Sequence, residues 1–228
     1  ESIGRAVESL LASYEAVGGI NHRSGANLPS RESVIRIVQD LETLAFPGYR
    51  REDGIDDANV GYMIGELAHR VAGSLVAELE RSLEYANRVA GGSGCPAACH
   101  IEARDLALAF IEALPELRRV LMLDVDAAFA GDPAAKSIEE VILSYPGLEA
   151  IAVHRFAHWF WTRKVPLIPR MMSEYVHAKT GIDIHPGATI EKHFQMATLW
   201  RLENNATAPG SGRLGIGSTT FSSSLPVA

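Results

Sequence analysis

The sequence predicts a mainly α fold, in which a helical bundle over residues 1–180 precedes a short extended segment and an irregular tail. Three observations predict it. Apolar side chains recur at helical spacing up to about residue 180, and residues 181–194 then change to a short-period extended pattern. Residues 195–228 are rich in Gly, Ser, Thr and Asn, a composition typical of an irregular, disordered end.

The clearest helix is expected over residues 59–88. Its apolar side chains recur every three or four positions and so form one stripe. They are Val60, Ile64, Leu67, Val71, Leu75, Leu79 and Leu83. The glycine-rich stretch 91–94 ends this helix.

A second helix is expected over residues 102–114. Pro115 should start a new turn there, because proline lacks the N–H that a helix interior uses. Apolar spacing resumes after it, and a capping box formed by Ser137 and Glu140 predicts another short helix.

The next helix is expected to begin at Pro146, since proline suits the first helical position. Its aromatic run, Phe156 to Trp161, is interpreted as core or interface. Pro166 and Pro169 interrupt the pattern, and a last helix is expected over residues 170–178, before Gly181.

The composition is that of an ordinary globular chain, with 47% hydrophobic and 21% charged residues among 228. A net charge of -7 argues against broad nucleic-acid binding, which needs a basic surface. No apolar run approaches the roughly 18 residues of a membrane span, so no membrane partner is expected. The first residues carry acidic side chains, unlike a signal peptide, and the start without Met leaves room for an upstream segment.

Two patterns resemble metal sites. Cys95 and Cys99 could supply soft ligands, but a structural zinc site needs four, so two incidental thiols in a reducing cytoplasm are the preferred interpretation. His154 and His158 share one helix face, where a packed or hydrogen-bonded role is favoured over metal binding. No metal is predicted.

Two further stretches have a local interpretation. Asp132 follows a glycine and precedes a proline, which is typical of a turn that ends one helix and begins another. Ile184 and Ile190 are six residues apart with small residues between them, a spacing typical of hexapeptide parallel β-helices, although a single period is weak evidence.

Four stretches together resemble the serine O-acetyltransferases in order and spacing, closest to the bacterial branch with a long helical N-terminus. The resemblance covers roughly residues 30–194. The stretches begin at Asp132 (Asp-Pro-Ala-Ala), Tyr145 (Tyr-Pro-Gly-Leu-Glu-Ala-Ile), His154 (His-Arg-Phe-Ala-His-Trp-Phe-Trp) and Thr180 (Thr-Gly-Ile-Asp-Ile-His-Pro-Gly-Ala-Thr-Ile).

The resemblance implies an N-terminal α-helical bundle followed by the start of a left-handed parallel β-helix, with its first coil at residues 181–194. It also implies a homo-oligomer, a trimer or hexamer; the cytoplasmic location expected for the chain follows instead from its two cysteines, which are too few for a disulfide framework. The implied reaction is acetyl transfer from acetyl-CoA, a co-substrate, to the hydroxyl of L-serine for cysteine biosynthesis, with no other cofactor.

The resemblance also assigns two carboxylates. Asp183 corresponds to the aspartate that orients the catalytic histidine, and Asp132 to the aspartate that binds substrate serine. The chemistry accounts for these residue types, because a serine hydroxyl needs a base to take its proton and an imidazole base needs a carboxylate partner.

The chain departs from the family beyond Phe194. The family's catalytic Asp-His pair would fall at positions 197 and 198, which hold Ala197 and Thr198, and His193 lies too early to replace the base. The sequence therefore predicts impaired catalysis, from either a truncated or frameshifted product or a natural paralogue. The alternative function is a non-catalytic helical module for oligomerisation or partner binding. Cysteine synthase is a further possible partner, although the family's C-terminal docking tail is not recognisable in residues 225–228.

Overall fold

The computed structural model describes residues 2–22, 27–50, 58–94 and 96–192, and every regular element within these ranges is a helix. The helices are α1 (Ser2–Ala16), α2 (Arg31–Ala45), α3 (Val60–Val89), α4 (Pro96–Gly131), α5 (Ile138–Ser144), α6 (Pro146–Thr162) and α7 (Ile168–Thr180). The mainly α prediction is therefore confirmed. The expected irregular tail, 195–228, lies outside the described residues.

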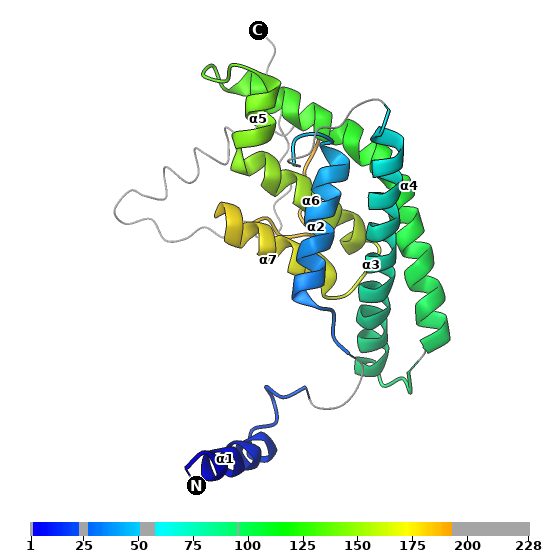
Figure 1. The fold of residues 1–228 in the computed structure, drawn as a ribbon, viewed down its shortest axis with the longest axis vertical. Helices are drawn as coiled ribbons and strands as arrows, with labels where there is room; N and C mark the ends of the chain where they lie inside the picture. The colour runs from blue at the N-terminus through cyan, green and yellow to red at the C-terminus, as the bar shows by residue number, and fades with distance from the viewer. Residues whose placement is uncertain (1, 23–26, 51–57, 95, 193–228) are drawn as a thin grey trace.

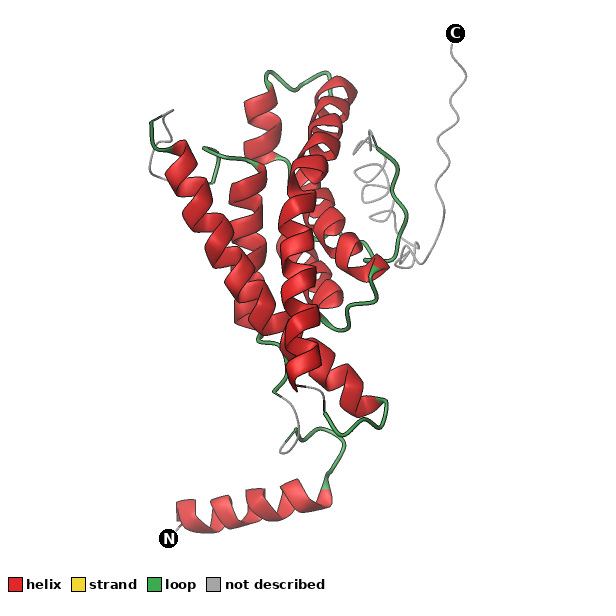
Figure 2. Cartoon of the chain, turned by 90° about the vertical axis from the view of Figure 1, so that its right-hand side faces the viewer, coloured by secondary structure: helices red, strands yellow, loops and turns green. Residues whose placement is uncertain are grey.

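The bundle is built on the long antiparallel pair of α3 and α4, against which α2, α6 and α7 pack (Figure 1). α1 stands apart from it, at the opposite end from α5 in both views (Figure 2). The stripe predicted for α3 faces the core at Leu67, Val71, Leu75 and Leu79, which are 5% exposed or less, whereas Ile64 is 37% exposed.

An aromatic cluster forms the centre of the core between α4 and α6. The ring of Phe110 lies 4.5 Å from that of Phe160, 5.0 Å from Trp159 and 6.2 Å from Phe156, measured between centroids. Tilted and edge-on contacts of this kind add to the hydrophobic gain of burial. The core interpretation of the aromatic run is confirmed for these residues, but the side chain of Trp161 is 42% exposed.

The expected break at Pro115 is wrong, because α4 runs through it without interruption. A proline inside a helix removes one backbone hydrogen bond. The apolar face nevertheless continues past it, with Leu114, Leu121 and Val125 buried, and this packing outweighs the local preference.

The other predicted helix boundaries are largely confirmed. Pro146 occupies the first turn of α6, and the Ser137 hydroxyl accepts a hydrogen bond from the Glu140 amide (3.2 Å) at the start of α5. α7 begins at Ile168, so Pro169 lies in its first turn instead of interrupting the chain. Gly181 ends α7 with a φ of 78°, a left-handed conformation that glycine adopts without steric cost.

The expectation of two incidental thiols is wrong for Cys99. This residue lies in the first turns of α4, is 3% exposed, and is disulfide-bonded. Cys95 lies outside the described residues.

A buried pair of carboxyl groups links three helices. Glu42 of α2 and Glu149 of α6 are 2% and 9% exposed, and their side chains share a hydrogen bond. Arg50 lies 3.3 Å from Glu42, and Lys179 of α7 forms an ion pair with Glu149. Burial and the neighbouring Glu149 outweigh Arg50 and raise the pKa of Glu42 to about 7.

Candidate active site

The segment after α7 packs along α6 with alternate side chains turned inward. Ile182, Ile184 and Ala188 are 9%, 7% and 8% exposed, and Pro186 is also buried. A period of two is what extended backbone produces when one side contacts a core. Asp183, between two buried isoleucines, is exposed. The carboxylate predicted to be catalytic is therefore directed away from the helical core.

Side chains of α6 hold the turn at Pro186 and Gly187. The Nδ1 atom of His158 lies 2.9 Å from the Pro186 carbonyl oxygen, and because a carbonyl only accepts, this nitrogen carries the proton. Trp161 contacts His185 edge to face, with ring centroids 4.8 Å apart. A Cβ atom on Gly187 would lie 2.7 Å from Trp161 Nε1, so only glycine fits there without movement. The hydrogen-bonded role predicted for His158 is confirmed.

Arg155 anchors the far end of the same segment. Its guanidinium binds both carboxylate oxygens of Asp124 on α4, at 2.5 and 2.8 Å, and the two side chains are 9% and 1% exposed. It also donates to the backbone carbonyls of Ile190 (3.3 Å) and Glu191 (3.1 Å). A buried bidentate ion pair of this kind holds the arginine side chain in one orientation, because the guanidinium presents its donors in a rigid plane.

His154 lies beneath this segment and is 2% exposed. Burial, together with the neighbouring His158 and Arg155, lowers its pKa to about 3, so the imidazole is neutral at physiological pH. Its ring faces the backbone of Ala188, and its Nδ1 atom is buried without a hydrogen-bond partner. His154 is therefore a packed histidine, as predicted, and not a cation.

Asp132, the predicted substrate-binding carboxylate, begins the turn after α4. It accepts hydrogen bonds from the Tyr145 hydroxyl (2.5 Å) and from the Ala134 amide (2.9 Å). These two donors, the tyrosine first, lower the pKa of Asp132 below its usual range, and the bond raises the pKa of Tyr145 to about 12. Asp132 thus has the predicted turn role and stays anionic at neutral pH.

The two predicted site residues occupy different elements. Asp132 follows α4 and Asp183 follows α7, and within the described residues no hydrogen bond or ion pair joins them. Sequence reasoning missed the partner role of Tyr145 and the pairing of Arg155 with Asp124. Tyr145 begins one of the four family-like stretches, so it could have been proposed as the hydrogen-bond partner of Asp132. No local sequence pattern, by contrast, indicates that Asp124 is buried.

No metal site is found in the part of the chain that the structure describes, where no group of three metal-ligating side chains occurs. Within the same ranges, no helix has the length and apolar character that a membrane span requires. His193, Ala197 and Thr198 lie outside the described residues, so the predicted loss of the catalytic histidine stays a sequence-based prediction.

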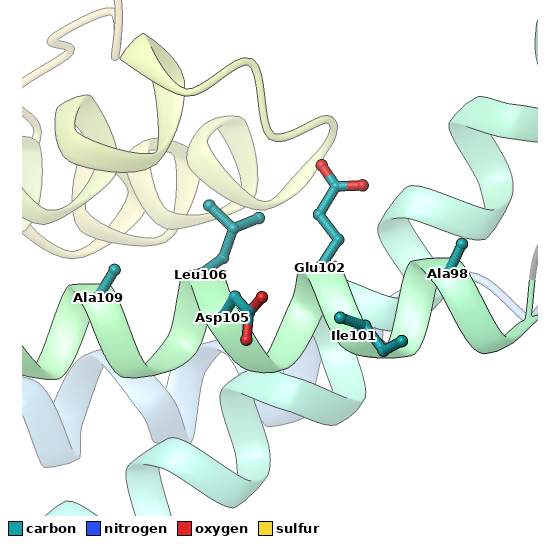
Figure 3. A pocket seen from close by; sticks show the side chains of 6 residues that line it. All are labelled: Ala98, Ile101, Glu102, Asp105, Leu106 and Ala109. Carbon is teal, nitrogen blue, oxygen red and sulfur yellow. The ribbon is translucent and has the colours of Figure 1, made fainter.

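A hollow along α4 lies far from Asp132. Figure 3 shows its lining, which is Ala98, Ile101, Glu102, Asp105, Leu106 and Ala109. At 1.5 Å per residue, the helix places Ala109 about 33 Å from Gly131, the residue before Asp132. The hollow is therefore separate from the Asp132 turn, and none of the residues that line it is a predicted site residue.

Comparisons with known proteins agree on one family. The chain is 40% identical over 169 residues to a plasmid-encoded serine acetyltransferase of Synechococcus elongatus, covering 73% of this chain and 53% of that protein. It is 50% identical over 76 residues to the serine acetyltransferase of Bacillus subtilis, covering 33% of this chain and 35% of that protein. The chain is a relative of the serine acetyltransferases. It spans about half the length of the first relative and about a third of the second.

Solved structures give the same relationship. Serine acetyltransferase 1 of Entamoeba histolytica, determined in complex with L-cysteine, superposes with a TM-score of 0.55 and 30% identity, over 74% of this chain and 54% of that one. Its native form superposes with a TM-score of 0.55 and 28% identity. No family model matches the chain.

Proposed function

We propose that this protein is a serine O-acetyltransferase. The observation that carries the proposal is the 40% identity to a serine acetyltransferase over 169 residues, supported by a superposition at 30% identity. The substrates are acetyl-CoA and L-serine, and the products are O-acetylserine and free coenzyme A.

In the proposed reaction, the serine hydroxyl oxygen attacks the thioester carbonyl carbon. A base takes the hydroxyl proton as the new C–O bond forms, the C–S bond breaks, and the thiolate of coenzyme A receives a proton. A serine hydroxyl is a poor nucleophile at neutral pH, so the base and its orienting carboxylate are the groups on which the rate depends.

Asp183 is proposed as the orienting carboxylate and Asp132 as the anion that binds the serine ammonium. The exposure of Asp183 on a backbone held by His158 and Arg155 supports the first role, since a carboxylate that orients an imidazole must itself be fixed. The lowered pKa of Asp132 supports the second, because an ionised carboxylate attracts an ammonium group.

The base is not assigned to a residue of this chain. With Ala197 and Thr198 at the positions of the family's Asp-His pair, neither side chain can accept the hydroxyl proton, so we propose that this chain alone has little activity.

We further propose that residues 181–194 form the first coil of a left-handed β-helix and that the protein assembles as a trimer or hexamer. Ile184, which is 7% exposed, and Ile190, which packs against the core, lie six residues apart as inward positions of such a coil would. Cysteine synthase stays a sequence-based possibility, since residues 225–228 lie outside the described part.

The test measures thiol release from acetyl-CoA with L-serine as acceptor. The 228-residue chain should be nearly inactive, and a chimera carrying the later residues of the Synechococcus relative after Phe194 should be active. In that chimera, Asp183→Asn should lower kcat by roughly 10²-fold or more, whereas Asp126→Asn, an exposed aspartate on α4, should not. A folded chimera that transfers no acetyl group to L-serine would refute the proposal.

The alternative, a non-catalytic module that joins full-length copies, is favoured by the wholly helical character of the described elements. Co-expression with the chimera distinguishes the two functions. A module should enter mixed oligomers and leave their activity per active subunit unchanged.

A further inference from the structure

Asp132 is held by two hydrogen-bond donors that come from different parts of the chain. The Tyr145 hydroxyl donates to one carboxylate oxygen (2.5 Å), and the Ala134 amide donates to the other (2.9 Å). A carboxylate accepts up to about four hydrogen bonds, shared between its oxygens. Each oxygen of Asp132 therefore keeps room for a donor from a ligand.

Both donors are neutral, so they leave the negative charge of Asp132 in place. Asp124 of α4, by contrast, is paired with the guanidinium of Arg155. Within the described residues, no cation forms an ion pair with Asp132, and its pKa is lowered by hydrogen bonds alone. An oriented anion without a cationic partner is suited to a cationic ligand.

Tyr145 presents its hydroxyl from a rigid position between α5 and α6. Its amide donates to the Val141 carbonyl (3.2 Å), and its own carbonyl accepts from the Leu148 amide (3.1 Å). Pro146 follows it and restricts its backbone to an extended conformation, with a φ of -90° and a ψ of 110°. The ring is half-buried and packs against the hydrophobic core. The hydroxyl therefore reaches Asp132 at little further cost in conformational entropy.

The phenol remains a donor over the whole physiological pH range. The hydrogen bond to Asp132, burial, and the charges of Asp132 and Glu140 raise the pKa of Tyr145 to about 12. The Glu140 carboxylate itself accepts a hydrogen bond from the Lys136 amide (2.8 Å) before α5. Because Tyr145 does not ionise, it holds the carboxylate of Asp132 in one orientation.

A purely structural link between the end of α4 and the α5–α6 junction is the other interpretation of this bond. Such links matter most between buried groups, because a buried polar atom without a partner carries the full cost of desolvation. Asp132 and Tyr145 are both only half-buried, so water can satisfy either group. An orienting role toward a ligand accounts for the bond better.

We propose that Tyr145 is a positioning residue, whose hydroxyl holds the Asp132 carboxylate in the orientation that binds the ammonium group of the substrate. The proposal rests on the proposed function, in which Asp132 binds L-serine, and it adds the residue that orients this carboxylate. The ligand class that the pair accepts is a primary ammonium, whose N–H donors fit the free acceptor positions of the carboxylate.

The test is titration of the full 228-residue chain with L-serine. It is followed by the carboxyl carbon resonance of Asp132 in NMR spectra, which Asp132→Asn identifies by its loss. N-acetyl-L-serine, which has no ammonium group, is the matched ligand. Tyr145→Phe removes only the hydroxyl, and the control Tyr175→Phe removes a hydroxyl of α7 that contacts Gln39 (3.4 Å). Melting temperatures separate changes of stability from changes of affinity.

L-serine should move the Asp132 resonance of the parent and of Tyr175→Phe at the same concentrations, and N-acetyl-L-serine should not move it. Tyr145→Phe should bind L-serine roughly three- to tenfold more weakly, the range expected for the loss of one hydrogen bond. At neutral pH Asp132 is ionised in both proteins, so this loss reports orientation and not charge. Binding should disappear as the pH falls through the pKa of Asp132, and at a higher pH in Tyr145→Phe.

Equal affinity of the parent and Tyr145→Phe for L-serine would overturn the proposal, and a lower melting temperature alone would make the hydroxyl a structural link. An Asp132 resonance that L-serine does not move, or that N-acetyl-L-serine moves equally, would overturn the ammonium site as well. Acetyl transfer by the chimera tests the proposed function separately. An active chimera beside either of these results would refute the role of the Asp132–Tyr145 pair alone.

Discussion

Glu42 makes the stability of this protein sensitive to pH near neutrality. Its carboxyl is 2% exposed and faces Arg50, Glu149 of α6 and Lys179 of α7. Burial is the largest cause that raises its pKa from 4.5 to about 7, and Glu149 adds to it. Between these two pH values, the folded state holds a proton that the unfolded state has lost.

Because the folded state binds a proton on Glu42 more tightly than the unfolded state does, the free energy of unfolding falls as the pH rises. The stabilisation from the protonated carboxyl is fully present below pH 4.5 and is lost as the pH rises through about 7. A difference of roughly 2.5 pKa units at 1.36 kcal/mol each corresponds to about 3 kcal/mol of unfolding free energy. Glu42→Gln stays neutral throughout and so escapes this loss.

The assay is urea unfolding of the parent and Glu42→Gln at several pH values from 4 to 8. The free energy of unfolding of the variant minus that of the parent should rise by about 3 kcal/mol across this range. Glu66→Gln, on the exposed face of α3, is the control and should give a nearly constant difference. A constant difference for Glu42→Gln as well would refute the reasoning, because it would mean that Glu42 ionises equally easily in both states.

Three further substitutions test the site and its support. Gly187→Ala should push Trp161 away from the turn, because the added Cβ atom would lie 2.7 Å from the Nε1 atom of Trp161. The tryptophan fluorescence should then shift to the red, and an unchanged spectrum would contradict the steric argument. Tyr145→Phe should raise the pKa of Asp132 toward 3.8, as followed by carboxyl NMR, and no change would show that the phenol does not stabilise the anion. Ser30→Ala removes the oxygen that accepts from the Ser33 amide at the start of α2 and should cost about 1 kcal/mol in urea unfolding; a neutral result would exclude a capping role.

Local signals in the sequence were sufficient for most helix boundaries. Pro146, Ser137 and Gly181 act through backbone geometry and nearby hydrogen bonds, so their effects can be predicted without knowing the fold. Pro115 shows the limit of this reasoning. A proline at this position favours the end of a helix, but the buried face of α4 continues on both sides of Pro115.

The candidate site was predictable as residue types but not as contacts. Asp132 and Asp183 were identified through motifs whose order and spacing resemble one family, and the turn role of Asp132 was predictable from its neighbours. Its bond to Tyr145 spans 13 residues, and the pair of Arg155 with Asp124 spans 31. Neither distance corresponds to a helical or extended repeat, so no periodic pattern reveals these partners.

The sequence by itself determined the helical class, the change of backbone after residue 180, and the family likeness, because each depends on short-range patterns. Only the tertiary structure decided that Glu42 and Glu149 share a buried hydrogen bond, that α6 holds the Asp183 segment, and that α1 stands apart. The physical reason is that burial and pairing depend on which helix faces pack together. That packing brings together residues that lie far apart in the chain.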